Sequence, residues 1–215
     1  MTHKVAGGAV DGEGLVLGNT YDKYGSRNPV VKWLMRGFHN ALDELVSLAK
    51  PTAIYEVGCG EGYWVARWHA AGYDARGCDI SPEVVALARE NTVALQLPTE
   101  TFEVRNIYDV ERPRSPEELV VCCEVLEHID DPERGLRALQ GIAGGYVVLS
   151  VPREPIWRAL NMLRGKYLGR LGNTPGHIQH WSCDSFQQLV DTWFEIVEIR
   201  TPLPWTLLLC RVRSL

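Results

Sequence analysis

The stretch Ala53–Trp64, AIYEVGCGEGYW, constrains the fold of this chain more than any other. The β-prone run Ala53–Val57 leads directly into a glycine-rich turn, Gly58-Cys59-Gly60-Glu61-Gly62, and residues with helical character follow. A strand that ends in such a turn and opens a helix is a nucleotide-binding arrangement, because glycines allow tight turns and let a ligand lie against the backbone. Tyr63 stands where a dinucleotide-binding fingerprint has its third glycine, so the turn departs from that pattern.

Alternating strand-like and helix-like segments continue along the chain and predict a single doubly wound α/β sheet. Strands are expected over residues 53–57, 75–80, 101–105, 118–123, 145–151, 194–200 and 206–213. Helices are expected over residues 30–48, 63–71, 132–142, 156–163 and 184–191. A further helix begins at Ser81-Pro82-Glu83, where serine caps the free N–H groups and proline fits the first turn. A chain of 215 residues, 46% of them hydrophobic, can bury one full core.

Charge and cysteine usage exclude several classes of protein. A net charge of -5 and a pI of about 5.7 argue against a nucleic-acid binder, which needs a basic face; a modest Arg153–Arg170 cluster is the exception. The six cysteines form no C-x-x-C pair, so we expect most of them to be small buried hydrophobic residues. The chain shows no signal-peptide pattern and no apolar run of membrane-spanning length, so we expect a cytoplasmic protein without a membrane span.

Two motifs resemble those of a known family. Glu56, Val57 and the glycine-rich turn are similar to motif I of the class I S-adenosylmethionine (SAM) methyltransferases. The segment Glu124-Val125-Leu126-Glu127-His128 resembles the one after the fourth strand in a large methyltransferase group that includes quinone-biosynthesis O-methyltransferases. The resemblance covers residues 53–213. It implies a Rossmann-like fold with a mostly parallel seven-stranded sheet, an antiparallel C-terminal hairpin, and SAM as the cofactor.

Spacing and resemblance together predict the residues that bind SAM. Asp79 ends the second expected strand about 20 residues after the glycine turn, where an acid usually accepts hydrogen bonds from both ribose hydroxyls. Asn106 occupies the position at which the resembled family usually has an adenine-binding Asp, and its amide oxygen can still accept a hydrogen bond. The full expected set is Glu56, Gly58, Cys59, Gly60, Asp79, Ile80, Asn106, Ile107 and Glu124.

The predicted catalytic residues are His128, as a general base, and His180. Ligands of open α/β sheets bind beyond the carboxyl ends of the strands, so His128 should face the methyl donor between two carboxylates. No metal is expected, but the resemblance leaves one alternative open. In small-RNA 2′-O-methyltransferases and some quinone-biosynthesis relatives, such a grouping binds a metal, here Glu124, Glu127 and His128 with His177 or His180.

Residues 1–50 are expected to form an N-terminal arm and a cap helix, and residues 51–215 the methyltransferase domain. Residues 152–181 interrupt the α/β alternation, and the resemblance implies that such an insert is a substrate lid. The expected acceptor is a small molecule, not a nucleic acid, and the protein is expected to be a monomer or homodimer. The residues expected to bind the acceptor are Tyr21, Tyr24, Arg27, Trp157, Tyr167, His177 and Trp181.

The sequence therefore predicts SAM-dependent methyl transfer to a small molecule, with a hydroxyl oxygen as the favoured acceptor. The first alternative is a nicotinamide-dependent oxidoreductase. Tyr63 in place of the third glycine and the lack of a recognisable Tyr-x-x-x-Lys pair disfavour it. The second alternative is a partner protein that binds SAM without catalysing a reaction, and the sequence leaves it open.

Overall fold

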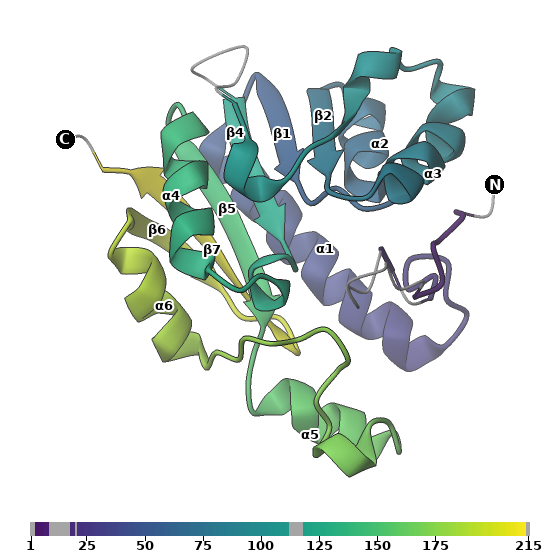
Figure 1. Ribbon diagram of the computed structural model, residues 1–215, viewed down its shortest axis with the longest axis vertical. Coiled ribbons are helices and arrows are strands. Elements are labelled where there is room, and N and C mark those ends of the chain that lie inside the picture. Colours follow the sequence, from purple (N-terminus) through teal and green to yellow (C-terminus); the bar gives the residue numbers. More distant parts are fainter. Residues whose placement is uncertain (1–2, 9–17, 20, 112–117, 214–215) are drawn as a thin grey trace.

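The computed structural model describes residues 3–8, 18–19, 21–111 and 118–213, and their elements form one α/β sheet flanked by helices (Figure 1). The seven-stranded sheet has the order β3-β2-β1-β4-β5-β7-β6. Strands β1 to β5 pair in parallel, whereas β7 pairs antiparallel with both β5 and β6. The predicted doubly wound sheet with an antiparallel C-terminal hairpin is confirmed.

The strands lie close to their predicted positions, and the differences are at their ends. They are β1 (Ala53–Val57), β2 (Asp74–Asp79), β3 (Phe102–Val104), β4 (Glu118–Cys123), β5 (Tyr146–Pro152), β6 (Phe194–Arg200) and β7 (Trp205–Val212). The largest difference is β3, which is only three residues long. Thr101 closes a 3₁₀ turn, and Arg105 has already turned towards the loop that follows, where its backbone N–H donates to the carbonyl oxygen of Asp79.

The helices begin at capping residues that the sequence supplies. They are α1 (Pro29–Ala49), α2 (Tyr63–Ala70), α3 (Pro82–Thr92), α4 (Pro132–Ile142), α5 (Ile156–Leu163) and α6 (Cys183–Asp191). The side chains of Asn28, Ser81, Asp131 and Ser182 accept hydrogen bonds from the first turns of α1, α3, α4 and α6. Helices α2 and α5 differ, because they follow Gly62 and Pro155 without a side-chain cap; the first N–H groups of α2 are left for other partners.

Helices cover both faces of the sheet. Helices α1, α2 and α3 pack on one face against alternate residues of the strands, among them Ile54, Val121 and Leu207. Helices α4 and α6 pack on the other face against the intervening residues, such as Tyr55 and Val120. Because successive side chains of a strand point to opposite faces, the apolar strands supply two cores at once. Five of the six cysteines are buried and none is in a disulfide, as expected.

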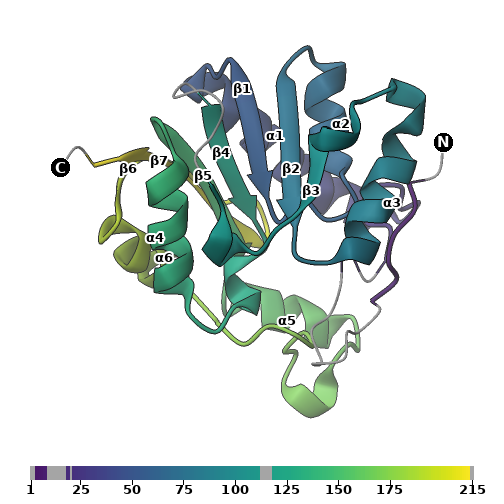
Figure 2. The same ribbon diagram turned by 45° about the horizontal axis from the view of Figure 1, so that its top comes forward.

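Two features place the functional region. Parallel pairing of β1 with β2 and with β4 brings the ends of these strands, and the segments that follow them, to one edge of the sheet. Helix α5 and the turn after it extend beyond that edge and protrude from the α/β body in both views (Figures 1 and 2). No helix in the described part of the chain combines the length and apolar character needed to cross a bilayer.

Candidate active site

A cavity of about 750 Å³ lies at the carboxyl ends of the parallel strands. The loops after β1, β2, β3 and β4 form one side of it, and residues of the N-terminal arm, α1 and the insert form the other. This is the crevice at which open α/β sheets bind their ligands, next to the point where the strand order reverses between β1 and β4. The cavity therefore brings together segments from almost the whole chain.

The glycine turn forms a floor that side chains would block. Gly58 has a φ of 79°, and a Cβ atom there would lie 2.2 Å from Cγ2 of Val125. The backbone N–H groups of Gly58 and Cys59 both donate to the carbonyl oxygen of Cys78, each at 2.8 Å, and so fix the turn on β2. Gly58, Cys59 and Gly60 all line the cavity, which leaves room for a ligand against the main chain.

Asp79 connects the glycine turn to the next helix. Its carboxylate accepts hydrogen bonds from the backbone N–H of Gly60 at 3.0 Å and from that of Ser81 at 3.1 Å. Burial raises the pKa of Asp79, and these two hydrogen bonds oppose the rise. The backbone N–H of Ile80 also opposes the rise, so at least one of the about four lone-pair positions of the carboxylate remains for a ligand hydroxyl group. Asp79 lines the cavity, and its arrangement fits a ribose.

The residues expected to bind adenine lie after β2 and β3, and a polar network fixes the chain there. Ile80, Asn106 and Ile107 line the cavity, as does Arg105. The amide oxygen of Asn106 accepts a hydrogen bond from the N–H of Tyr108 at 3.0 Å and caps the turn that places Ile107. One lone pair of this oxygen therefore serves the fold, and the other remains for a ligand.

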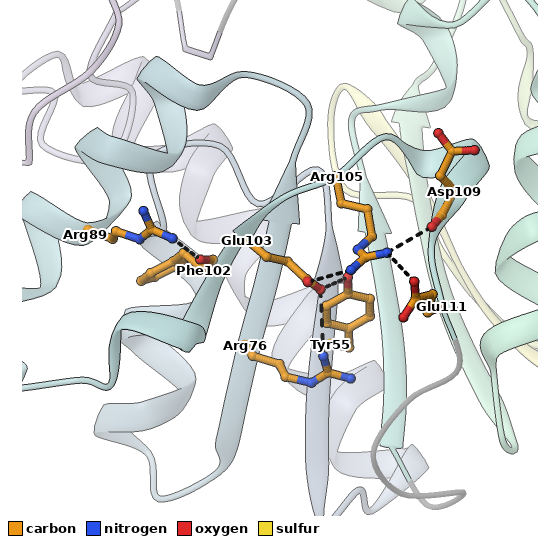
Figure 3. A network of polar contacts seen from close by, with 8 residues as sticks. All are labelled: Tyr55, Arg76, Arg89, Phe102, Glu103, Arg105, Asp109 and Glu111. Atoms are coloured by element: carbon orange, nitrogen blue, oxygen red, sulfur yellow. Dashed lines mark hydrogen bonds and ion pairs between the residues drawn. The ribbon is translucent and has the colours of Figure 1, made fainter.

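Arg105 links this turn to the strands. Its guanidinium contacts Glu103 at 3.1 Å and Glu111 at 3.0 Å and donates to the carbonyl oxygen of Asp109 at 3.2 Å. The hydroxyl of Tyr55 donates to the same Glu103 carboxylate at 2.7 Å, as Figure 3 shows. The network fixes the path of the chain after β3, since β3 itself is too short to do so.

Two carboxylates face the methyl-donor side of the cavity. Glu56 is 3% exposed, and its Oε2 has no hydrogen-bond partner among the described residues. Burial and the nearby Asp79 raise its pKa well above the usual range. Such a buried polar group costs free energy unless a ligand satisfies it, which makes Glu56 a candidate contact for a cationic amine.

Glu124 is held differently. Its φ of 59° is strained for a non-glycine residue and typically costs about 1–3 kcal/mol. Its two oxygens accept from Oγ of Ser150 at 3.1 Å and from Nε1 of Trp205 at 2.7 Å. These bonds tie Glu124 to β5 and β7 and hold its strained backbone at the cavity wall.

His128 lies in the 3₁₀ turn Leu126–His128 with a defined tautomer. Its Nδ1 is 2.9 Å from the carbonyl oxygen of Gly176, and a carbonyl can only accept, so Nδ1 carries the proton. Nε2 therefore has a free lone pair, and it lies 4.0 Å from Oε1 of Glu127. Burial lowers the pKa of His128, which keeps the ring neutral. The free lone pair of Nε2 can therefore accept a proton.

Glu127 and His177 complete this group. Glu127 is 1% exposed, neither of its carboxylate oxygens has a partner among the described residues, and burial with Glu124 nearby raises its pKa. The His177 ring lies edge-on to that of His128, with centroids 4.9 Å apart, and burial lowers its pKa to about 3. The backbone carbonyl of Glu127 accepts from the N–H groups of Ile178 and Gln179, which ties the insert to this corner.

The geometry that a metal would use differs from the expected set. Glu127, His128 and His177 each offer a ligand atom, and these atoms lie within 4.8 Å of one another. Glu124 is not in this group, because Ser150 and Trp205 engage its oxygens. His180 is not in it either: it is exposed, and its Nε2 contacts Oδ1 of Asn173 at 2.8 Å. Of the two insert histidines weighed in the sequence, the structure brings only His177 to the group.

The expected acceptor residues divide between the cavity and the surface. Tyr21, Tyr24, Trp157, Tyr167 and His177 line the cavity. Tyr24 stacks on Tyr63 with ring centroids 3.6 Å apart, and Trp157 stacks on His177 at 5.7 Å.

Arg27, Trp181 and His180 do not line it. Arg27 is exposed just before the cap residue of α1, and the Trp181 ring packs against Phe186 of α6, on the other side of the insert. The insert turns back to the body between His177 and Trp181, so the side chains of His180 and Trp181 lie outside the cavity.

Three residues matter at the site although no role was assigned to them in the sequence. Lys23 lines the cavity from the arm, and its charge lies close enough to Glu56 and Glu124 to oppose the rise in their pKa. Glu61 is 1% exposed and accepts from the N–H groups of Ala6 and Asn19, so it fastens the arm to the glycine turn. Trp205 holds Glu124. The sequence carried a signal only for Glu61, an acid inside a glycine motif; the other two depend on long-range contacts.

Comparisons with known proteins show the family of this chain. The chain matches the family model described as "Methyltransferase domain" over residues 32–193. It is 31% identical over 123 residues to the ubiquinone biosynthesis O-methyltransferase of Xanthomonas campestris pv. campestris (strain B100), a match that covers 55% of this chain and 51% of that protein. The chain thus spans about half the length of the curated relatives it matches.

Solved structures show the same fold. Magnesium protoporphyrin IX methyltransferase from Synechocystis PCC 6803, solved with bound SAH, aligns with a TM-score of 0.65 and 19% identity over 88% of this chain and 90% of that one. The PH0226 protein from Pyrococcus horikoshii OT3 aligns with a TM-score of 0.66 and 13% identity over 87% and 93%. Since the family model covers most of the chain, this protein belongs to the methyltransferase domain family, the class I SAM-dependent group that its sequence resembles.

Proposed function

We propose that this chain transfers a methyl group from SAM to a hydroxyl oxygen of a small, largely apolar acceptor. When bound, SAM supplies a sulfonium whose methyl group is open to in-line displacement. Asp79 would accept from the ribose hydroxyls, Glu56 would meet the amine, and Ile80, Asn106 and Ile107 would enclose the adenine. The supporting observations are the glycine floor, the Asp79 carboxylate at the cavity and Oε2 of Glu56, which has no hydrogen-bond partner among the described residues.

The observation that carries the proposal is the tautomer of His128. Because Nδ1 donates to the carbonyl oxygen of Gly176, Nε2 is left unprotonated at the cavity. As the acceptor oxygen displaces S-adenosylhomocysteine from the methyl carbon, its proton would pass to Nε2 of His128, which lies 4.0 Å from the buried carboxyl of Glu127. Positioning supplies most of the remaining acceleration, since a well-oriented displacement gains about 7–11 kcal/mol over the bimolecular reaction.

The acceptor class follows from the cavity wall. Trp157, Trp205 and Phe38 form an aromatic group, with Trp157 and Phe38 each packed against Trp205 at ring-centroid distances of 5.9 and 5.0 Å. Tyr21, Tyr24 and Tyr167 line the same space. An aromatic or lipid-like acceptor fits these side chains. The cytoplasmic location and the monomeric or homodimeric state stay predictions from the sequence.

The test is turnover of SAM to S-adenosylhomocysteine with a panel of phenolic acceptors. The substitution His128→Asn keeps an N–H donor for Gly176 and removes the base, so kcat should fall about 10²–10⁴-fold while SAM affinity is unchanged. His180→Asn is the matched control, because His180 lies outside the cavity. Unchanged turnover in His128→Asn would refute the assignment of the base. SAM binding without any turnover would favour the non-catalytic alternative, and binding of NAD in place of SAM would favour an oxidoreductase.

A metal held by Glu127, His128 and His177 is the alternative chemistry for the same corner. The unpartnered oxygens of Glu127 and the two neutral imidazoles fit a divalent cation such as zinc or manganese. Such a cation would lower the pKa of an acceptor hydroxyl and replace the base. Full activity after chelation, with loss in His128→Asn, favours the base. Activity restored only by added metal favours the metal.

A further inference from the structure

The insert has a charge pattern unlike the rest of the chain. None of the 27 acidic residues lies between Pro155 and Cys183, whereas four of the 22 basic residues do: Arg158, Arg164, Lys166 and Arg170. The protein as a whole carries a net charge of -5. A local excess of positive charge in an acidic protein is concentrated on α5 and the turn after it.

The same segment exposes large apolar side chains. The exposed fractions are 82% for Leu163, 59% for Leu168 and 66% for Leu171, and Met162 is also exposed. Single exposed leucines are ordinary, but several within ten residues form a surface that water solvates poorly. We call Met162–Leu171 the insert tip. It protrudes from the α/β body at the end of α5 (Figures 1 and 2).

The basic side chains of the tip form no ion pair within the part of the chain that the structure describes. Among the described residues, no ion pair joins Arg164, Lys166 or Arg170 to an acid, and the contact given for Arg164 is a hydrogen bond to the amide oxygen of Asn161. The turn itself is well built, since Asn161 is buried and donates to the carbonyl oxygen of Gly172 at 2.9 Å. The turn therefore presents leucines interleaved with cations that have no acidic partner among the described residues.

The tip borders the cavity entrance. Leu163 and Arg164 belong to the tip and also line the cavity, and two further apolar lining residues, Val30 and Ile178, are 58% and 50% exposed. Lys166, Leu168, Arg170 and Leu171 lie beyond the lining. The tip thus shares residues with the cavity lining, and both carry exposed apolar side chains.

We propose that the insert tip docks on an anionic lipid surface and places the cavity entrance against it. Apolar side chains that enter the interfacial layer and lysines or arginines that meet lipid phosphates are the two signals that stable peripheral binding requires. An RNA would leave the leucines in water, and an acidic protein would need a matching apolar groove, so a lipid surface satisfies both halves of the pattern best. Docking goes beyond the proposed methyl transfer and does not depend on it.

Co-sedimentation with vesicles tests the proposal. The full chain should bind vesicles of phosphatidylcholine mixed with phosphatidylglycerol and bind phosphatidylcholine alone much more weakly. Lys166→Gln with Arg170→Gln should weaken the partition coefficient about five-fold per residue, and raised salt should have a similar effect. Leu168→Ser with Leu171→Asn should weaken it at least ten-fold. Asparagine is chosen because residue 171 has a φ of 49°.

Matched controls lie on other surfaces. Val93→Ser with Leu95→Ser removes two exposed apolar side chains next to α3, and Arg211→Gln with Arg213→Gln removes two exposed cations on and beside β7. Both should bind vesicles like the unmodified protein. All variants should bind S-adenosylhomocysteine normally, which separates docking from the proposed function. No binding to anionic vesicles, equal binding by the tip variants, or binding to RNA in preference to vesicles would each overturn the proposal.

Discussion

Replacing the Asp79 carboxylate by an amide should separate its two roles, anchoring the glycine turn and binding the cofactor. In Asp79→Asn one oxygen still accepts a backbone N–H, but the NH₂ group faces the other N–H, that of Gly60 or Ser81. An unsatisfied donor in this buried position costs about 1–3 kcal/mol of unfolding free energy. The lost charge removes a strong acceptor from the ribose, worth about 1.5–3 kcal/mol, so affinity for S-adenosylhomocysteine should fall roughly 10–100-fold.

Calorimetric titration with S-adenosylhomocysteine and urea unfolding monitored by fluorescence measure the two effects separately. Asp74→Asn is the matched control, because Asp74 begins the same strand but is exposed and far from the cavity lining. It should change neither quantity by more than a few tenths of a kcal/mol. A folded Asp79→Asn protein that binds S-adenosylhomocysteine with affinity within two-fold of the unmodified chain would refute the ribose assignment.

Two further predictions concern backbone strain and pH. Gly58→Ala should destabilise the protein by about 2 kcal/mol or more and abolish cofactor binding, because residue 58 has a positive φ and the added Cβ would meet Val125. Gly141→Ala is the control, because nothing lies within 4 Å of a Cβ there, and it should have neither effect. Urea titrations measure the change in unfolding free energy. Burial lowers the pKa of His177 from 6.5 to about 3, so below pH 6.5 this histidine binds a proton in the unfolded chain but not in the folded protein. The contribution of His177 to the free energy of unfolding is therefore full above pH 6.5 and is lost as the pH falls towards 3. The difference in this free energy between the unmodified protein and His177→Gln should shrink by up to about 1.4 kcal/mol per pH unit. A constant difference between pH 6.5 and 4.5 would contradict this.

Much of the fold could be predicted from local patterns. Helices α4 and α5 and strands β1, β4 and β6 have the predicted bounds, because caps, prolines and alternating apolar residues act over a few residues. The short β3 could not be predicted, since its end is set by the 3₁₀ turn at Thr101 and by the contacts of Arg105 with Glu103 and Glu111.

The sequence by itself determined the side of the cavity that the glycine turn and Asp79 form. The glycine turn and Asp79 belong to one continuous strand–helix–strand unit, so their spacing along the chain already fixes their spacing in space. The structure places both at the cavity, as the motif predicts. Local backbone geometry, which the sequence encodes directly, is enough to build this half.

Only the tertiary structure decided the other side of the cavity, where we propose that the acceptor binds. It selected His177 over His180, brought Lys23 from the arm, and placed Trp205 of β7 beside Glu124, which is 81 residues earlier in the chain. No local pattern signals such contacts, because they arise when the insert and the hairpin pack against the ends of other strands. Which of two nearby histidines faces inwards depends on where the insert turns back to the body, and that is set by the backbone bonds of Ile178 and Gln179 to Glu127.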